Sequence, residues 1–290
     1  MRFTRTLLRV SLNSLSTVAP RLAGRGVFWL FRHPLTRMKV TPVEQRLLDA
    51  ACHGSVSVRG KNVVTYAWGD GERPVLVLHG WQSRASHLAA FITALRERGY
   101  TPVTFDAPGH GASEGRAATL LDYREVIGRL SREHGPFEAI VAHSLGAAAA
   151  FLALRDGAAR TGRLVAVSGL SDFDYVLDYF CTDLGLRPRL RAELRDRIER
   201  VLFPGEPEVW RRFDAADSPE EITARMLLIH DERDRYIRIE QSHKTAAAYG
   251  EQARLHVTSG LGHRRILGDP EVVKLTMEHV TAPADVTLRG

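Results

Sequence analysis

The sequence predicts an α/β protein whose mostly parallel, doubly wound sheet is covered by helices on both faces. Continuous apolar runs bounded by glycine or proline are typical of strands that are buried on both faces. These runs alternate with segments of helical length, and most connections between them are short. The 290 residues, of which 44% are hydrophobic and 26% charged, are enough to bury a sizeable core.

The elements alternate along most of the chain. Residues 55–60 and 62–69 show a period of two, which indicates a hairpin. Strands are predicted at residues 74–80, at the start of 101–111, and at 138–143, 163–169, 225–231 and 254–257; those at 74–80 and 138–143 are expected to be buried. Helices are predicted at residues 86–99, 118–134, 145–156, 239–249 and 264–279.

Residues 171–224 interrupt this alternation. They contain no strand pattern, and the stretch "RPRLRAELRDRIERVL" (187–202) places arginines four positions from acidic residues. Such pairs are typical of a solvated helix face. We therefore interpret residues 171–224 as a helical lid inserted into an α/β core that consists of residues 55–170 and 225–282.

Positive charge is concentrated in an N-terminal arm, which we place at residues 1–54. Residues 1–40 contain no acid and eight cations: Arg2, Arg5, Arg9, Arg21, Arg25, Arg32, Arg37 and Lys39. Without these eight, the chain has 32 cations against 34 acids, a net charge of −2. This near-neutral body argues against a nucleic-acid partner, which would require a basic face on the folded domain.

A single serine stands where a predicted strand ends and an alanine-rich helix begins. In the stretch "EAIVAHSLGAAAA" (138–150), the residues Ala142 to Gly146 match the nucleophile elbow G-x-S-x-G, with alanine in place of the first glycine. A sharp turn of this kind holds Ser144 at the carboxyl edge of the sheet and at a helix N-terminus, where developing negative charge is stabilised.

A serine nucleophile needs a base and a group that orients the base. His263 follows the last predicted strand, and Asp234 follows the strand at residues 225–231. Residues just past the carboxyl ends of parallel strands converge on one crevice, so these side chains are expected near Ser144. Asp231 is an alternative for the acid, because it lies near the same strand end.

Five motifs occur in an order that resembles the serine α/β-hydrolases of the esterase and lipase type. They are HGW (79–81), D-x-P-G-H-G-x-S (106–113), the elbow (142–146), H-D-x-x-D (230–234) and G-x-G-H (260–263). The combination HGW, AHSLG and GLGHRRIL further resembles a bacterial group within that superfamily.

The resemblance implies an α/β-hydrolase fold with a helical lid and assigns roles to five residues. Ser144 would be the nucleophile, His263 the base and Asp234 the acid. The backbone N–H groups of Trp81 and Leu145 would form the oxyanion hole.

The predicted function is cleavage of a carboxylic ester, a small-molecule substrate, through an acyl-serine, with no cofactor and no metal. Thioesterase, lactonase and acyltransferase activities use the same residues and remain alternatives. A non-catalytic binding module of the same fold is the alternative from another class. Tyr175, Tyr179 and Phe180 of the lid are candidates either for lid packing or for the substrate pocket.

The N-terminal arm leaves three interpretations open. On a helical wheel of residues 2–15, arginines occupy one sector and apolar side chains about half of the circumference. The apolar half could pack on the body, the segment could be a targeting sequence, or residues 1–40 could attach to an anionic membrane surface. We expect a cytoplasmic protein, with peripheral membrane attachment as the hypothesis to be tested.

Overall fold

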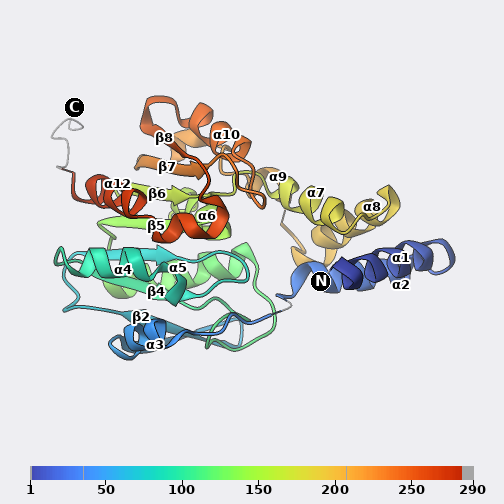
Figure 1. The fold of residues 1–290 in the computed structure, drawn as a ribbon, viewed down its shortest axis with the longest axis horizontal. Coiled ribbons are helices and arrows are strands. Elements are labelled where there is room, and N and C mark those ends of the chain that lie inside the picture. The colour runs from blue at the N-terminus through green and yellow to red at the C-terminus, as the bar shows by residue number, and fades with distance from the viewer. Residues whose placement is uncertain (1, 35, 207, 283–290) are drawn as a thin grey trace.

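An eight-stranded sheet forms the centre of the protein (Figure 1), in the order β1-β2-β4-β3-β5-β6-β7-β8. The computed structural model describes residues 2–34, 36–206 and 208–282, with the backbone alone at residues 2–5. The strands are β1 (Cys52–Val58), β2 (Lys61–Ala67), β3 (Pro74–Leu78), β4 (Thr101–Phe105), β5 (Ala139–His143), β6 (Arg163–Val167), β7 (Arg225–Asp231) and β8 (Ala253–Thr258). The pairs β1–β2 and β2–β4 are antiparallel and the other five are parallel, as the sequence predicts.

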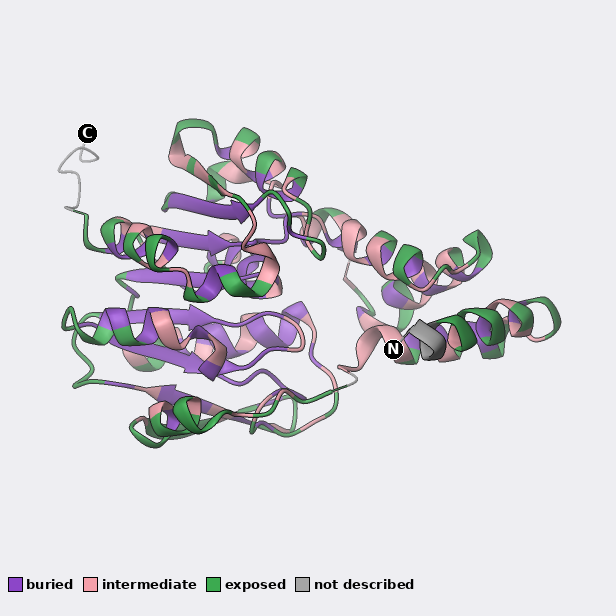
Figure 2. Ribbon diagram, in the orientation of Figure 1, coloured by how far each residue is buried: buried purple, intermediate pink, exposed green. Residues whose placement is uncertain are grey.

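Helices cover both faces of this sheet, and the inner strands are buried between them (Figure 2). One face is covered by α5 (Leu120–His134), α6 (Leu145–Arg155) and α10 (Glu240–Tyr249), and the other by α3 (Pro42–Asp49), α4 (Ala89–Arg96) and α12 (Pro270–Thr281). Shorter turns of helix are η1 (Ala85–Leu88), η4 (Gly250–Gln252), α11 (Gly262–Arg265) and η5 (Ile266–Gly268).

The predicted helix at residues 264–279 is divided in the structure into α11, η5 and α12. Asp269 begins α12 as its N-cap, because its side chain accepts hydrogen bonds from the backbone N–H groups of Glu271 and Val272. Pro270 follows at the first helical position, where its missing N–H costs nothing. The break keeps His263 on a separate short helix beside the end of β8.

Residues 171–224 extend from the carboxyl end of the sheet as a group of helices (Figure 1). The helices are α7 (Phe173–Asp183), α8 (Pro188–Arg197), η2 (Ile198–Leu202), α9 (Val209–Arg212) and η3 (Pro219–Glu221). No strand occurs among the described residues of this segment, which we call the lid. The lid connects β6 to β7.

The N-terminal segment divides between the lid and the core, which the sequence does not predict. Helices α1 (Arg2–Val18) and α2 (Pro20–Arg32) form a hairpin that packs on α8 of the lid (Figure 1). Helix α3 instead packs on the core, where Leu48 is buried and the indole N–H of Trp68 donates to the carbonyl of Leu47. The core strands begin at Cys52, slightly before the predicted boundary at residue 54.

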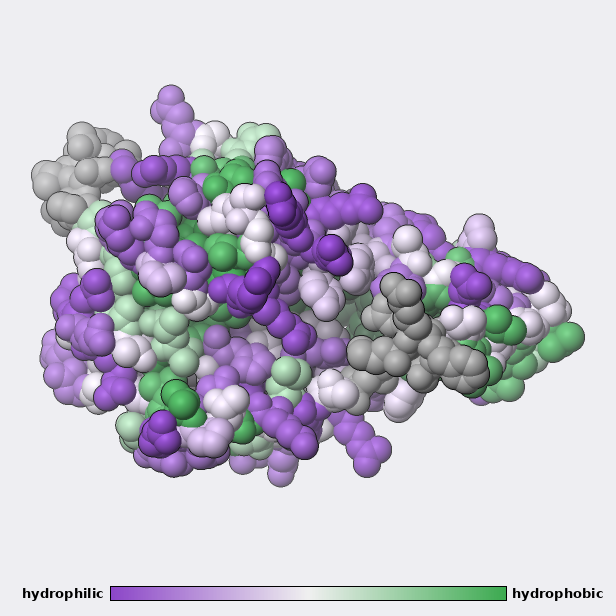
Figure 3. Space-filling model, in the orientation of Figure 1, coloured by the Kyte–Doolittle hydropathy of each residue, from purple (hydrophilic) through white to green (hydrophobic). Residues whose placement is uncertain are grey.

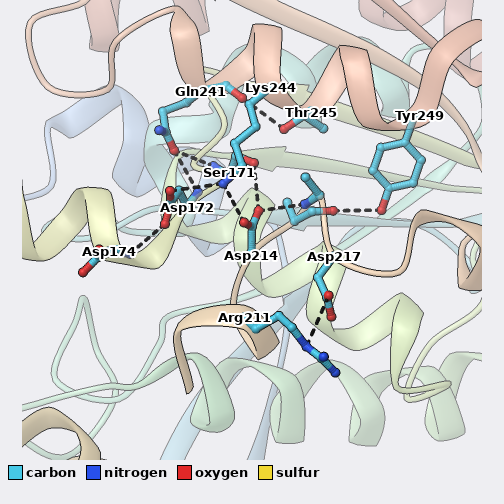
Figure 4. A network of polar contacts seen from close by, with 12 residues as sticks. Ser171, Asp172, Asp174, Arg211, Asp214, Asp217, Gln241, Lys244, Thr245 and Tyr249 are labelled. Atoms are coloured by element: carbon cyan, nitrogen blue, oxygen red, sulfur yellow. Dashed lines mark hydrogen bonds and ion pairs between the residues drawn. The ribbon is translucent and has the colours of Figure 1, made fainter. Parts of the chain in front are cut away.

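A polar network fixes both ends of the lid to α10 (Figure 4). The side-chain oxygen of Gln241 accepts hydrogen bonds from the backbone N–H groups of Ser171 and Asp172. Lys244 pairs with Asp172 at 3.1 Å and with Asp214 at 2.5 Å. These contacts join the first residues of the lid to its returning segment, so the root of the lid has a fixed position beside the sheet.

We expect Gln241→Leu to destabilise the protein. The substitution leaves the buried N–H of Ser171 and the partly buried N–H of Asp172 without an acceptor, and a buried unsatisfied group costs about 1–3 kcal/mol in the free energy of unfolding. Gln45→Leu is the matched control, because Gln45 is exposed and bonds only Asp49 on its own helix. Urea denaturation should show a clearly lower free energy of unfolding for Gln241→Leu, and a free energy within about 0.5 kcal/mol of the wild-type value for Gln45→Leu. Equal losses would contradict this role of Gln241.

Candidate active site

Ser144 lies at a strained turn between β5 and α6. Its backbone angles are φ 56° and ψ −121°, in a region that L-residues rarely adopt. The turn is held from the side of β6: the Ser144 N–H donates to the carbonyl of Val167, and its carbonyl accepts from the N–H of Leu170. Strain of this kind persists where surrounding contacts over-determine the conformation, and it points to a functional residue.

Two glycines allow neighbouring backbone to approach the turn. A Cβ atom at Gly146 would lie 2.7 Å from the carbonyl oxygen of His79 at the end of β3. A Cβ atom at Gly80 would lie 2.8 Å from the Cβ of Ser144. Ala142, which replaces the first glycine of the elbow, is buried and pairs in register with Leu78 and Ala166 of the neighbouring strands.

His263 and Asp234 form a hydrogen-bonded pair beside this turn. The Nδ1–H of His263 donates to Oδ2 of Asp234 at 2.7 Å. The other carboxylate oxygen accepts the backbone N–H groups of Tyr236 and Ile237 at 2.8 and 3.1 Å. Burial raises the pKa of Asp234, but the bonds from His263 and the two amides outweigh it and hold the pKa below its ordinary value. Asp234 is therefore a buried carboxylate that stays ionised.

Asp231, the alternative acid, has a different set of partners. Its carboxylate accepts hydrogen bonds from the backbone N–H groups of Arg233 and Leu261 and from the hydroxyl of Thr258. Burial alone would raise the pKa of Asp231, but the backbone and hydroxyl donors have the larger combined effect and hold the pKa below its ordinary value. Asp231 thus joins β7 to the loop that carries His263, and it makes no contact with the His263 ring among the hydrogen bonds of the described residues.

His143, the residue before Ser144, contacts His263 through a hydrogen bond and through its ring. Its Nε2–H donates to the backbone carbonyl of His263 at 2.9 Å, and the two ring centroids are 4.6 Å apart. Burial lowers the pKa of His143 well below its ordinary value, so the ring stays neutral. A neutral imidazole adds no positive charge that would compete with protonation of His263.

The loop after β3 carries Trp81, and two histidines hold this loop in place. The Nε2 atom of His110 accepts the N–H of Gln82 at 3.1 Å, and Nε2 of His79 accepts the N–H of Ala107 at 3.0 Å. Burial lowers the pKa of His110 to about 3, which keeps its ring neutral and able to accept. Among the described hydrogen bonds, the N–H groups of Trp81 and Leu145 have no acceptor, so both are free to donate to a ligand.

One cavity of about 670 Å³ brings the candidate residues together. It is lined by every site residue predicted from the sequence except Asp234, which lies behind His263: Ser144, His263, Trp81, Leu145, Tyr175, Tyr179 and Phe180. No hydrogen bond joins Ser144 Oγ to His263 in the described part of the chain, and such bonds are often long before substrate binds.

Sequence reasoning missed part of the cavity wall. Leu8, Leu30 and Phe31 of the N-terminal hairpin line the cavity beside the lid. Tyr236 also lines it, with its ring centroid 5.4 Å from that of His263. The position of Tyr236 two residues after Asp234 is a signal that could have identified it. In the described ranges, no cluster of three or more His, Cys, Asp or Glu residues could hold a metal ion.

The chain belongs to the alpha/beta hydrolase family, whose model matches residues 75–274. Its fold is similar to that of an esterase from Pyrococcus furiosus, with a TM-score of 0.63 and 21% identity over 86% of this chain and 97% of that one. An esterase from Rhodococcus gives a TM-score of 0.58 and 14% identity over 81% and 100% of the two chains. A thioesterase domain from the curacin biosynthetic pathway gives 0.57 and 20% over 79% and 99%.

These likenesses confirm the predicted α/β-hydrolase fold. Comparison with curated proteins gives no significant sequence match. The family model begins at residue 75, so the N-terminal hairpin lies outside the part of the chain that defines the family.

We expect Asp234→Asn and Asp231→Asn to fail in different ways. An amide at position 234 would turn the wrong tautomer of His263 toward Ser144, with a loss of about four powers of ten in kcat/KM. An amide N–H at position 231 would meet the backbone N–H and hydroxyl donors that Asp231 now accepts, and would lower the free energy of unfolding by about 1–3 kcal/mol. We expect its loss of kcat/KM to be smaller than that of Asp234→Asn. Ester hydrolysis and urea denaturation of both variants test this. The opposite ranking in kcat/KM would make Asp231 the acid.

Proposed function

We propose that the protein is a serine hydrolase that cleaves a carboxylic ester through an acyl-serine intermediate. The observation that carries this proposal is the ionised Asp234, bonded to His263 beside a serine in the strained elbow conformation. Ser144 and His263 face one cavity and Asp234 bonds His263 from behind, which is the arrangement that acyl transfer requires of a nucleophile, a base and an orienting acid.

In the proposed mechanism, Ser144 Oγ attacks the ester carbonyl while Nε2 of His263 takes its proton. Asp234 accepts the Nδ1–H of His263 and stabilises the imidazolium that forms. The free N–H groups of Trp81 and Leu145 bind the oxyanion, a contribution that is typically worth a few kcal/mol. His263 then protonates the leaving alcohol and later activates the water that releases the acid.

The cavity favours an apolar acyl group. Its lining includes aromatic and aliphatic side chains from the lid and from α2, and Phe180 of the lid contacts Phe31 of α2 edge to face with ring centroids 5.3 Å apart. A cavity of about 670 Å³ is in the range of pockets that enclose small organic ligands. We therefore propose esters of lipophilic acids as the substrate class, with thioesters of the same acids as the second class to assay.

A fluorophosphonate probe tests the nucleophile directly. We expect the wild-type protein to be labelled and Ser144→Ala to be unlabelled, with Ser144→Ala and His263→Ala both losing several powers of ten in kcat. Ser83→Ala is the matched control, because Ser83 lines the same cavity outside the elbow, so its labelling should persist. Labelling of Ser144→Ala, or more than about a tenth of wild-type activity in it, would overturn the mechanism. A wild-type protein that is neither labelled nor active would favour a binding module.

Chain-length preference tests the acyl pocket. Phe180→Trp enlarges a ring that lines the cavity and contacts Phe31, so we expect at least a tenfold lower kcat/KM for an ester of a long acid. The acetate ester is the internal control, since its acyl group does not reach the aromatic wall and its rate should change little. Equal effects on both esters would place the acyl group elsewhere in the cavity.

A further inference from the structure

The hairpin of α1 and α2 is fixed to the lid along one side. The side chain of Asn13 donates to the carbonyl of Gly185 at 2.9 Å and accepts the N–H of Arg187 at 3.0 Å, which joins it to the α7–α8 turn. Leu12 and Val27 are buried in the same contact region. Because these contacts hold the inner side of the hairpin, its opposite side is presented outward in a defined orientation.

That outer side is unusually apolar for an exposed surface. Of the nine large hydrophobic side chains that are exposed among the described residues, five lie on α1 and α2. They are Leu7 (59% exposed), Val10 (52%), Val18 (81%), Leu22 (57%) and Trp29 (54%). Figure 3 shows hydrophobic residues gathered at the end of the molecule that these helices form.

The five side chains follow the helical repeat, so they form a surface rather than isolated exposures. Leu7, Val10 and Val18 lie within one sector of about 80° on α1, at about 100° per residue. Leu22 and Trp29 are seven residues apart on α2 and share one face as well. The apolar half expected of α1 is therefore divided: Leu8 turns toward the cavity and Leu7 toward solvent.

Cations accompany this outer surface. Arg21 and Arg25 of α2 are exposed, and neither has an ion pair among the described residues. Arg25 lies three residues after Leu22 and four before Trp29, so it adjoins their face. Arg9 is exposed as well, but its side chain lies against Gly185 on the side of the lid. Residues 1–40 contain no acid that could neutralise them. The side chains of Arg2, Phe3 and Arg5, which the sequence places on the same helix, lie outside the described residues.

We propose that the outer face of the α1–α2 hairpin docks on an anionic lipid bilayer. An apolar stripe flanked by arginines matches the acyl boundary and the charged headgroups of such a surface at once. A second copy of the chain fits less well, because a two-fold contact would bring the same unpaired arginines face to face. No helix in the described ranges is long and apolar enough to cross a membrane.

Co-sedimentation with vesicles tests the proposal with the full-length protein. We expect binding to phosphatidylcholine vesicles that contain one third phosphatidylglycerol, and much weaker binding to pure phosphatidylcholine. Arg21→Gln with Arg25→Gln should lower the partition coefficient about fivefold for each arginine removed. Leu22→Ser with Trp29→Ser should lower it at least tenfold, since both apolar groups would otherwise leave water. Salt at 1 M should weaken wild-type binding, because it shortens the screening length to about 3 Å.

Val43→Ser is the matched control, because Val43 is 66% exposed on α3, away from the hairpin. Its vesicle binding should equal that of the wild type, and thermal melting of all variants should show that they remain folded. Hydrolysis of a soluble ester should stay unchanged in every variant, which separates a failure here from a failure of the proposed function.

Three outcomes would overturn the proposal. The first is an absence of binding to anionic vesicles, and the second is equal, salt-insensitive binding by wild type and variants. The third is a dimer in solution that dissociates in Leu22→Ser with Trp29→Ser while vesicles are not bound. That result would assign the outer face to a second copy of the chain.

Discussion

The strained backbone at Ser144 is the constraint on which the site depends. A φ of 56° at a serine persists only because neighbouring backbone holds it, through hydrogen bonds to Val167 and from Leu170. Both partners lie at or just beyond the end of β6, where the lid begins. The approach of β3 on the other side requires Gly146. One turn therefore fixes the distances among the serine, the loop with Trp81 and the lid root.

The sheet and the candidate site could be predicted because their signals are local. Buried strands are short apolar runs, and each candidate residue follows the end of one. The choice between Asp231 and Asp234 could not be settled in this way, since Asp231 is the last residue of β7 and Asp234 follows three residues later. It depends on side-chain direction: Asp231 accepts the N–H of Leu261, whereas Asp234 accepts the ring N–H of His263.

The place of the N-terminal hairpin could not be predicted, because its contacts have no local signal. Asn13 meets Gly185 and Arg187 across more than 170 residues of chain. The helical wheel of α1 shows that one side is apolar, but it does not show whether that side lines a cavity, packs on another helix or is exposed to solvent. The division of the helix at residues 264–279, in contrast, had a local signal in Asp269 and Pro270.

The architecture separates the proposed chemistry from the shape of the cavity. Asp234 and His263 are held at the ends of β7 and β8 by hydrogen bonds that do not involve the hairpin. Leu8, Leu30 and Phe31 belong to the hairpin and line the cavity. A shift of the hairpin against α8 would thus move one wall of the cavity and leave Asp234 and His263 in place. Leu7 and Leu8 lie about 100° apart on α1, one exposed and one lining the cavity, so a force on the outer face acts on a helix that also contributes to the cavity wall.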